Sequence, residues 1–521
     1  MDKRLIQLPR RVKHSVAVRL IVSLSILSAS CTPGPEVADP VPERVEGSQL
    51  SGIHFESATV PGLPSISPSY GMTAVDFNLD GWSDLLVGRH KRHPRFFVNQ
   101  RGVLQGQSLA ALDEPPPGRA IYDLHGCSWG EANGDGRPDA YCVSGAQDGQ
   151  GEGPNRLLIQ AEAGGLSDRA ATFGLVDLQG RGRTSNWLDA DRDGDLDLFV
   201  ANEIRAGVPS ALFENINGET FRRVDSPLAA EFPVRSSASA DWNNDGYPDV
   251  LVLGHGFVGS RAFIGGRHGF LEIEVPRITG AEWLSATFED LNNDAAVDVL
   301  LVSEDRVIVM LNRNGSLVFE EELPVRGGRM ATLLDVENDG DLDIFLVRGA
   351  LGDPPPTGAR NLPDLLYTRG GDGLLHRQTV PSLKGPDHGN GNASVAADFD
   401  RDGRVDLFVA NGYLDVGGPF QLLRNTSEIG NWLEIELVGD DRNPLAIGST
   451  VRVKWMSQEF TRFITDEVAF QTQGPVRLLH VGIGDGDEAN IEVTWPDGHR
   501  SCKKSRANEQ VQVQRSDNCI K

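Results

Sequence analysis

A nine-residue pattern of oxygen-bearing side chains recurs seven times along the chain. The copy at residues 189–197, DADRDGDLD, has acids at positions 1, 3, 5 and 9 and glycine at position 6. The other copies begin at residues 76, 131, 241, 290, 335 and 398, and some carry Asn at position 3. Ca²⁺ prefers six to eight oxygen ligands, and glycine permits a sharp turn around the ion. The pattern therefore predicts a family of calcium-binding loops.

The predicted ligands are the side-chain oxygens at positions 1, 3, 5 and 9 of each copy, and position 7 would add a backbone carbonyl. They are Asp76, Asn78, Asp80, Asp84, Glu131, Asn133, Asp135, Asp139, Asp189, Asp191, Asp193, Asp197, Asp241, Asn243, Asp245, Asp249, Asp290, Asn292, Asp294, Asp298, Asp335, Glu337, Asp339, Asp343, Asp398, Asp400, Asp402 and Asp406. Ca²⁺ is the expected cofactor, with up to seven ions. The alternative is a set of solvated acidic turns without metal, in which like charges would repel one another.

The residues after each copy predict strands. The EF-hand loop shares the early spacing but carries a bidentate Glu at position 12. Here that position holds Val87, Val200 and Val409 in three copies, within apolar runs such as Leu198-Phe-Val200. Continuous apolar runs of this length suit strands that are buried on both faces. Each loop is therefore expected to join two strands rather than two helices.

The seven copies are not equivalent. Ala295 replaces the expected glycine in the fifth copy, where a left-handed conformation would cost alanine ~1–2 kcal/mol. We expect this site to be the weakest or to stay empty. Glu131 and Glu337 are one methylene longer than Asp, which changes their reach and not their charge. The copies at 189–197 and 398–406 have four Asp each and are expected to bind best.

The repeat length predicts the architecture. Successive copies start about 45–63 residues apart, which suits the four-stranded blades of a propeller. We therefore expect an all-β fold, with a seven-bladed β-propeller over residues 51–428. After Asn425 the chain passes directly into a different region, so the last blade lacks an outer strand. Residues 51–57 are predicted to supply that strand and to close the ring.

The loops resemble FG-GAP/VCBS repeats, which are calcium-loop propeller units. The C-terminal part resembles the ASPIC/UnbV domain through Gly430-Asn-Trp-Leu433, Ala446-Ile-Gly448, Val451-Arg-Val-Lys454, His480-Val-Gly-Ile-Gly484 and Val493-Thr-Trp-Pro-Asp-Gly498. This pairing of modules is similar to the cartilage acidic protein family and its bacterial exported relatives. The resemblance implies an architecture and leaves the activity open.

The C-terminal region, residues 429–521, is predicted to be a small β-sandwich-like domain. Its strands are expected at 431–438, 449–455, 459–465, 490–495 and 510–514. No ligand-binding residues are carried over from the resemblance to this region.

The N-terminus predicts export. A basic stretch over residues 1–19 precedes the apolar Leu20–Leu27, the small Ser28–Ser30 and Cys31. This order describes a signal peptide over residues 1–30. The segment before Cys31 resembles a bacterial lipobox, which implies that Cys31 is lipidated and that the protein is an outer-membrane or cell-surface lipoprotein. The alternative is ordinary secretion into the periplasm or medium. Residues 31–50, rich in Pro and Glu, read as a linker.

The remaining cysteines number four, an even count that suits an oxidising compartment. Cys127 and Cys142 lie symmetrically about the 131–139 loop, so an antiparallel pair of strands would place them within disulfide reach. Cys502 and Cys519 would then pair near the C-terminus. The alternative is four free thiols.

Charge limits the partners. The formal net charge is −25 and the pI is about 4.8, which disfavours nucleic-acid binding. The acids of the seven loops account for nearly all of this charge, so the acidity is local. No apolar run is long enough for a membrane-spanning helix, and membrane contact is expected only through the lipid anchor.

The sequence lacks the common local signatures of a catalytic site, including HExxH, GxSxG and GxxxxGK[ST]. We expect a surface binding or adhesion module for a protein or glycan ligand. Trp129 and Trp187 precede metal loops and could stack on a sugar, although such aromatics more often fill a propeller centre. The alternatives are a polysaccharide-active enzyme of the lyase kind and a scaffold for the assembly of exported proteins.

Overall fold

Short apolar runs separated by Asp- and Gly-rich turns form strands throughout the computed structural model of the chain. The structure describes residues 52–519 except 114–122, 146–152, 163, 204–206, 230–231, 255–257, 351–360, 386–388, 413–415, 467, 470–471 and 475–476. The predicted signal peptide, the linker over 31–50 and Cys31 lie outside the described residues.

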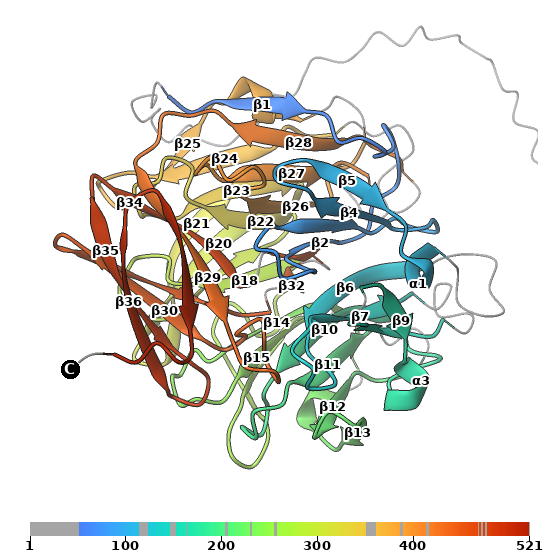
Figure 1. Cartoon of the computed structure of the whole chain (residues 1–521). Coiled ribbons are helices and arrows are strands. Elements are labelled where there is room, and N and C mark those ends of the chain that lie inside the picture. Colours follow the sequence, from blue (N-terminus) through green and yellow to red (C-terminus); the bar gives the residue numbers. More distant parts are fainter. Residues whose placement is uncertain are drawn as a thin grey trace, which may run out of the picture. The chain divides into compact units, whose positions relative to one another are not determined.

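Seven antiparallel sets of four strands each, here called blades one to seven, follow one another along the chain (Figure 1). Two short strands of the C-terminal region extend the sheet of blade one to six strands. From the inner to the outer strand, blade one consists of β2 (Met72–Val75), β3 (Asp84–Val87), β4 (Arg95–Asn99) and β5 (Leu104–Gln107); blade two of β6 (Leu124–Gly130), β7 (Asp139–Ser144), β8 (Arg156–Gln160) and β9 (Leu166–Asp168); and blade three of β10 (Gly182–Leu188), β11 (Asp197–Asn202), β12 (Ala211–Ile216) and β13 (Thr220–Val224). Blade four consists of β14 (Val234–Ala240), β15 (Asp249–Gly254), β16 (Arg261–Ile264) and β17 (Leu271–Ile273), and blade five of β18 (Ser285–Glu289), β19 (Asp298–Val302), β20 (Arg306–Arg313) and β21 (Ser316–Pro324). Blade six consists of β22 (Gly328–Leu334), β23 (Asp343–Arg348), β24 (Leu365–Arg369) and β25 (Leu375–Gln378), and blade seven of β26 (Ala393–Ala397), β27 (Asp406–Ala410), β28 (Phe420–Asn425) and β1 (Phe55–Ala58).

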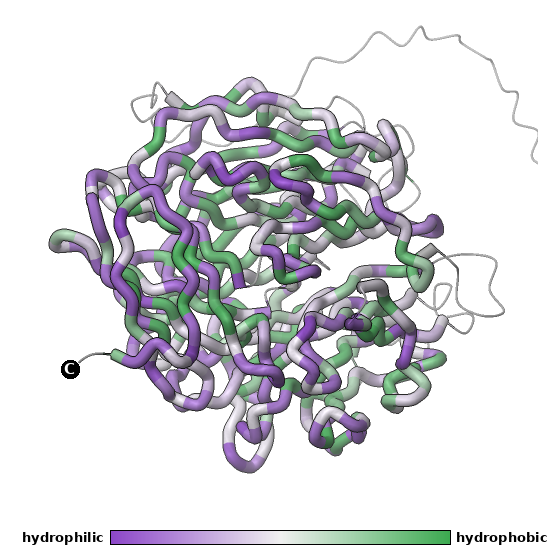
Figure 2. Tube along the Cα trace, in the orientation of Figure 1, coloured by the Kyte–Doolittle hydropathy of each residue, from purple (hydrophilic) through white to green (hydrophobic). Residues whose placement is uncertain are grey.

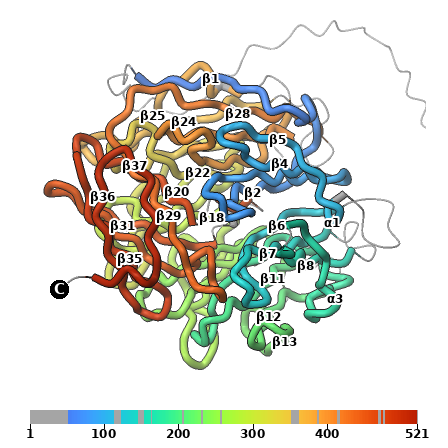
Figure 3. Tube along the Cα trace, in the orientation of Figure 1, coloured from blue at the N-terminus to red at the C-terminus, as the bar shows by residue number. Residues whose placement is uncertain are grey.

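The inner strands close a ring. Each inner strand contacts the next, in the order β2, β6, β10, β14, β18, β22, β26 and back to β2. Strand β1 pairs antiparallel with β28, with Phe55 opposite Asn425, so the N-terminal segment supplies the outer strand of blade seven. Figure 3 shows the blue β1 beside the orange β28. The predicted seven-bladed propeller and its closure by the N-terminal segment are therefore confirmed.

Burial explains the composition of each strand. All residues of β11 (DLFVAN) are buried, because its blade lies between two other blades. The outer strand β13 (TFRRV) is largely exposed and buries Phe221 alone. Figure 2 shows hydrophobic residues concentrated along the strands and hydrophilic residues in many of the connecting turns. The propeller is thus held together by apolar contacts between blades.

The C-terminal region contains two further sheets. One has the order β34 (Leu478–Gly484), β29 (Asn431–Val438), β37 (Glu509–Gln514), and the other β31 (Gln458–Phe463), β30 (Thr450–Trp455), β35 (Glu488–Thr494), β36 (Arg500–Arg506). A separate apolar core that includes Ile435, Val453 and Trp495 joins these sheets. Five of the strands match those predicted from sequence, whereas β34, β36 and the two-residue strands β32 (Val468–Ala469) and β33 (Thr472–Gln473) were missed.

Helices are few and short in the described part of the chain. They are α1 (Ala110–Asp113), α3 (Ala170–Phe173) and the 3₁₀ turns η2 (Pro227–Ala229) and η3 (Pro381–Lys384). Among the described residues, none of these helices has the length and apolar character needed to cross a membrane.

Candidate metal-binding loops

Each nine-residue pattern forms the turn between the inner and second strand of one blade. We call these turns loops one to seven; they span residues 76–84, 131–139, 189–197, 241–249, 290–298, 335–343 and 398–406. In every loop, position 9 is the first residue of the second strand, as Asp197 is in β11. The rigid strand pair therefore fixes the entry and the exit of each loop.

The seven loops share one backbone conformation. Position 4 has a positive φ in all of them, as at Arg192 (64°) and Asn244 (58°). Position 6 does as well, at Gly194 (93°) and at its counterparts in the other loops. Ala295 in loop five also adopts a positive φ of 66° and keeps the shared conformation despite the strain on a residue with a Cβ. The conformation thus does not depend on glycine at this position.

Hydrogen bonds fold each loop around its first carboxylate. In loop three, Asp189 accepts the backbone N–H groups of Asp193 (3.1 Å) and Gly194 (3.2 Å). The same pair of bonds recurs in loops one, four, five, six and seven. In loop two the longer Glu131 instead accepts from Asn133 and Gly134, both at 2.8 Å. With the extra methylene, the carboxylate at position 1 therefore accepts from N–H groups two residues earlier in the turn.

The Asp at position 9 ties each loop to its blade. Asp197 accepts the backbone N–H of Ala190 within the loop (3.0 Å) and that of Asn215 in the third strand, β12 (2.8 Å). Equivalent bonds occur in all seven blades. A change at this residue would therefore disturb the loop and the sheet together.

The carboxylates of a loop converge. In loops three, six and seven the acids at positions 1, 3 and 9 each place an oxygen within 4.8 Å of the other two, as Asp189, Asp191 and Asp197 do. Among the predicted ligands, three buried carboxylate oxygens have no hydrogen-bond partner, namely Oε2 of Glu131, Oε2 of Glu337 and Oδ1 of Asp400. A buried, unpartnered carboxylate oxygen is costly unless a cation pairs with it. The donor set therefore fits a hard divalent cation such as Ca²⁺.

Burial opposes ionisation of these acids in the metal-free chain. It raises the pKa of Asp84, Asp197 and Asp249 to about 8, and neighbouring carboxylates add to this effect. It also raises the pKa of Asp76 and Asp189 to about 6. A bound cation would favour the ionised forms.

Arginines distinguish the loops further. In loop seven, Arg424 hydrogen-bonds Asp406 and its Nε lies 3.4 Å from Asp400. In loop three the nearby Arg442 instead pairs with Asp195, outside the ligand set, at 3.5 Å. Loops three and seven are both rich in Asp, but in loop seven the guanidinium group of Arg424 already contacts two of the predicted ligands, Asp400 and Asp406.

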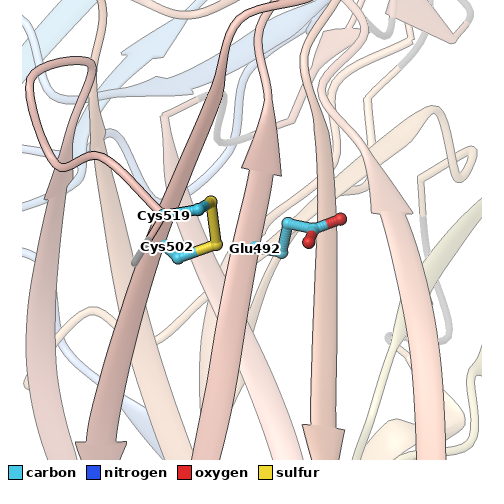
Figure 4. Close-up of side chains that lie close together, drawn as sticks. All are labelled: Glu492, Cys502 and Cys519. Atoms are coloured by element: carbon cyan, nitrogen blue, oxygen red, sulfur yellow. A yellow bond between two sulfur atoms is a disulfide. The ribbon is translucent and has the colours of Figure 1, made fainter. Parts of the chain in front are cut away.

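Both predicted cysteine pairs are disulfide-bonded in the structure. Cys127 on β6 faces Cys142 on β7 within blade two, and Cys502 is joined to Cys519 near the C-terminus. Figure 4 shows Glu492 beside the second bridge. Because both sulfurs are consumed by the bridge, this trio offers no thiolate to a metal ion.

Trp129 and Trp187 do not have the open faces that stacking on a sugar would require. Both side chains are fully buried, at 0% exposure. The Trp129 ring packs edge-on against Phe77 of blade one. The Trp187 ring packs edge-on against Phe221 of its own blade, and its Nε1 donates to the Ser128 carbonyl oxygen of blade two (3.2 Å). The prediction of a stacking role is therefore wrong for this structure, and the alternative, that these rings fill the propeller, holds.

A segment of the C-terminal domain enters the ring of inner strands. Strand β33 pairs in parallel with the inner strand β2, and β32 contacts β10, β14 and β18 (Figure 1). Asp466, just before β32, is fully buried, and Gln473 of β33 exchanges two hydrogen bonds with the backbone of Trp129. Sequence analysis missed these residues, because an isolated Asp or Gln in a turn carries no recognisable pattern.

The same domain covers the propeller face that carries the loops. Hydrogen bonds link it to loops two, three and six; the pairs are Gly136 N–H to Asp441 O (3.0 Å), Arg442 Nη1 to Asp193 O (3.0 Å), Gly430 N–H to Glu337 O (2.7 Å) and Gly484 N–H to Asn338 O (2.8 Å). The predicted metal loops therefore also form the surface on which the C-terminal domain rests.

Comparison with known families agrees with this architecture. The FG-GAP-like repeat matches residues 189–252 and 290–346, and the ASPIC and UnbV family matches residues 439–519. The chain is a β-propeller protein that combines FG-GAP-like repeats with an ASPIC and UnbV domain.

Its curated relatives have the same combination of modules. Cartilage acidic protein 1 of Homo sapiens is 24% identical over 502 residues, which cover 87% of this chain and 73% of the relative. The Mus musculus protein of the same name is 24% identical, over 89% of this chain and 77% of the relative.

Two solved structures of similar fold are a lectin from Agrocybe aegerita, described as recognising non-reducing terminal N-acetylglucosamine, and YCF48 from Cyanidioschyzon merolae. The lectin is 16% identical with a TM-score of 0.42, and the match covers 72% of this chain and 94% of the lectin. YCF48 is 12% identical with a TM-score of 0.42, covering 71% and 98%.

Proposed function

We propose that the chain is an exported, calcium-loaded β-propeller that acts as a non-catalytic binding module for a protein or glycan ligand. The observation that carries this proposal is the shared backbone geometry of the seven loops, together with the convergence of the acids in loops three, six and seven and the unpartnered carboxylate oxygens of Glu131, Glu337 and Asp400. Extracellular calcium modules bind their ions with Kd of about 10⁻⁴–10⁻³ M. Calcium would then be constitutively bound outside the cell and would serve the fold.

The filled centre of the propeller supports binding rather than catalysis. A lyase-like active site would need an open, polar channel, but Asp466 and Gln473 of the C-terminal domain occupy the ring of inner strands. The domain also covers the loop-bearing face. A partner would therefore meet the opposite face of the propeller or its outer strands.

The proposed location rests on the N-terminal sequence. Its basic, apolar and small-residue segments followed by Cys31 support export and a lipid anchor. The two disulfides fit an oxidising compartment. Labelling cells with an alkyne fatty acid should tag the wild-type protein and leave Cys31→Ala untagged. Equal labelling of both would exclude this anchor.

Calcium titration and ligand arrays test the function. Calorimetry on protein stripped with a chelating resin should show uptake of several Ca²⁺ ions. The same protein, with millimolar Ca²⁺ and again with chelator, is then applied to glycan and surface-protein arrays. Binding that chelator abolishes is the expected result. Absence of calcium uptake would contradict the proposal, as would release of new reducing ends from a polysaccharide.

A further inference from the structure

A small cavity lies between the propeller and the C-terminal domain. Its volume is about 140 Å³, and its lining includes Asp335, Asp398, Glu434, Thr472 and His480. Of these, Asp335 and Asp398 are the first residues of loops six and seven. A cavity of this size and polarity can hold water molecules. The polar lining of this cavity therefore contrasts with the apolar contacts that hold the blades together.

Three ionisable side chains converge at this cavity from three separate segments. Asp398 comes from loop seven, Glu434 from β29 and His480 from β34. One ligand atom of each lies within 4.8 Å of the other two. Nδ1 of His480 is 3.5 Å from Oε2 of Glu434, and the two side chains are only 9% and 7% exposed. The cluster is thus built across the domain interface and shielded from solvent.

The hydrogen bonds of Asn338 orient the imidazole of His480. The Asn338 amide nitrogen donates to the carbonyl oxygens of Gly403 (2.8 Å) and Gly430 (3.4 Å), so its oxygen must face the other way. That oxygen lies 3.0 Å from Nε2 of His480 and can only accept. Nε2 therefore carries a hydrogen, and Nδ1 faces the cluster.

Two atoms at the centre of the cluster have no hydrogen-bond partner. They are Nδ1 of His480 and Oε2 of Glu434, both buried. With Nε2 protonated, a neutral imidazole directs the lone pair of Nδ1 at an anionic oxygen. This arrangement is unfavourable unless a proton or a metal ion lies between the two atoms. Burial opposes protonation, but the carboxylates of Glu434, Asp398 and Asp335 raise the pKa of His480, so a proton and a metal ion would compete for Nδ1. The orientation of the ring by an outer amide is also the arrangement found around metal-bound histidines.

We propose that Asp398, Glu434 and His480 bind a divalent transition-metal ion of the zinc or manganese class, at a site that adjoins calcium loop seven and shares Asp398 with it. A spacing of 3.5 Å between Nδ1 and Oε2 suits two ligands each about 2.0–2.1 Å from one ion in near-tetrahedral geometry. The imidazole nitrogen selects against Ca²⁺, which takes oxygen ligands. A water molecule from the cavity would complete the coordination.

The carboxylate of Asp398 connects the proposed site to loop seven. Asp398 belongs both to this cluster and to the acids of loop seven. Because Glu434 and His480 belong to the C-terminal domain, an ion bound here would link that domain to blade seven. The site would thus act as a clamp between the two domains.

Zinc titration of the calcium-saturated protein tests the proposal. With Ca²⁺ held at several millimolar, the full chain should bind one further equivalent of Zn²⁺. Loss of an outer partner of a metal ligand already costs 10–100-fold in affinity. His480→Gln should therefore weaken this binding at least about tenfold. His499→Gln is the matched control, because His499 lies in the same domain and its Nε2 lies 2.8 Å from the Arg515 carbonyl oxygen, away from the cluster.

X-ray absorption at the zinc edge reports directly whether an imidazole coordinates the ion. A purely structural role of His480 would not produce this signal. One imidazole in the first shell is expected for the wild type and for His499→Gln. An all-oxygen shell would place the zinc in a calcium loop and overturn the proposal, as would unchanged affinity of His480→Gln. Glu434→Gln serves as a second ligand variant if His480→Gln does not fold. Failure of the wild type to bind zinc would identify the cluster as a buried ion pair.

Discussion

The backbone N–H of Trp187 donates a 2.6 Å hydrogen bond to the carboxylate of Asp466, a residue 279 positions away in the sequence. The same carboxylate accepts from Asn186 Nδ2 (3.2 Å) and Ser239 Oγ (3.1 Å). One side chain of the C-terminal domain thus holds the inner strands of blades three and four. The stability of the propeller and the docking of the C-terminal domain should therefore be coupled.

Replacing Asp466 by alanine tests this coupling. The change removes the acceptor for three buried donors, each of which costs about 1–3 kcal/mol when left unsatisfied. Even with partial relaxation or water entry, we expect Asp466→Ala to lower the free energy of unfolding by several kcal/mol. Urea unfolding followed by tryptophan fluorescence measures the loss. Asp485→Ala, at an exposed position of the same domain, is the control and should change little. Equal stability of the two variants would contradict the coupling.

Removal of a calcium ligand should weaken stabilisation by calcium to a different extent in different loops. An ion bound only by the folded state at 100 times its Kd adds about 2.7 kcal/mol. Asp193→Ala should remove most of this contribution from loop three. Asp294→Ala should remove less, because Asp294 already pairs with Arg313 (2.9 Å) and lies beside the strained Ala295.

The measurement is the melting temperature of each variant with and without Ca²⁺. Without calcium, both variants should lose less stability than with it, because they then lose only contacts within the protein. These include the hydrogen bond from the Asp195 N–H to Asp193 (2.9 Å) and the ion pair of Asp294 with Arg313 (2.9 Å). If both substitutions left the calcium-induced shift in melting temperature unchanged, the loops would not be the calcium sites.

Ala295 offers a substitution that should stabilise the protein. Its left-handed conformation, with φ of 66°, costs alanine ~1–2 kcal/mol relative to glycine. The greater freedom of glycine in the unfolded chain returns ~0.4–1 kcal/mol. Ala295→Gly should therefore raise the free energy of unfolding by up to about 1.5 kcal/mol and strengthen loop five.

The reverse change provides the comparison. Gly246 occupies the same position in loop four, with φ of 87°. Gly246→Ala should destabilise the protein by about as much as Ala295→Gly stabilises it. Urea unfolding curves measure both effects. A destabilising Ala295→Gly would show that the alanine methyl makes a compensating contact.

The sequence predicted the propeller because its signal is repeated. Seven loops of one pattern, each followed by a buried apolar run such as Leu198-Phe-Val200, define both the number of blades and the second strand of each. The closing strand could be predicted as well, since the last blade ended at Asn425 without an outer strand. An error in predicting the strands of one blade does not change the predicted fold, because the other copies of the repeat indicate the same arrangement.

Contacts between the domains could not be predicted in this way. Asp466 and Gln473 occur once each, without a periodic pattern around them, and their partners Trp187 and Trp129 lie 279 and 344 positions away in the sequence. Even His480, which stands inside a recognisable motif, gave no indication of its approach to Asp398. Such contacts depend on how the folded propeller and the folded C-terminal domain dock onto each other. The hydrophobic periodicity of the sequence carries no information about this docking.

The calcium-free protein should lose stability as the pH rises. Burial raises the folded-state pKa of Asp84, Asp197 and Asp249 to about 8, from an ordinary value of 3.8. Between pH 4 and 8 the folded state therefore holds more protons than the unfolded state. Protons bound preferentially by the folded state stabilise it, so this contribution is present at low pH and disappears as the pH passes through about 8.

Bound calcium should reverse this behaviour, because the ion takes the place of the protons. Urea midpoints between pH 5 and 8.5 measure the effect on resin-stripped protein and on protein with several millimolar Ca²⁺. We expect the midpoint of the stripped protein to fall across this range. The difference between the two preparations should widen with pH, since ion and proton compete for the same oxygens. A stripped protein whose midpoint rises toward pH 8 would mean that these acids ionise without a cation, and the buried carboxylates would then need another partner.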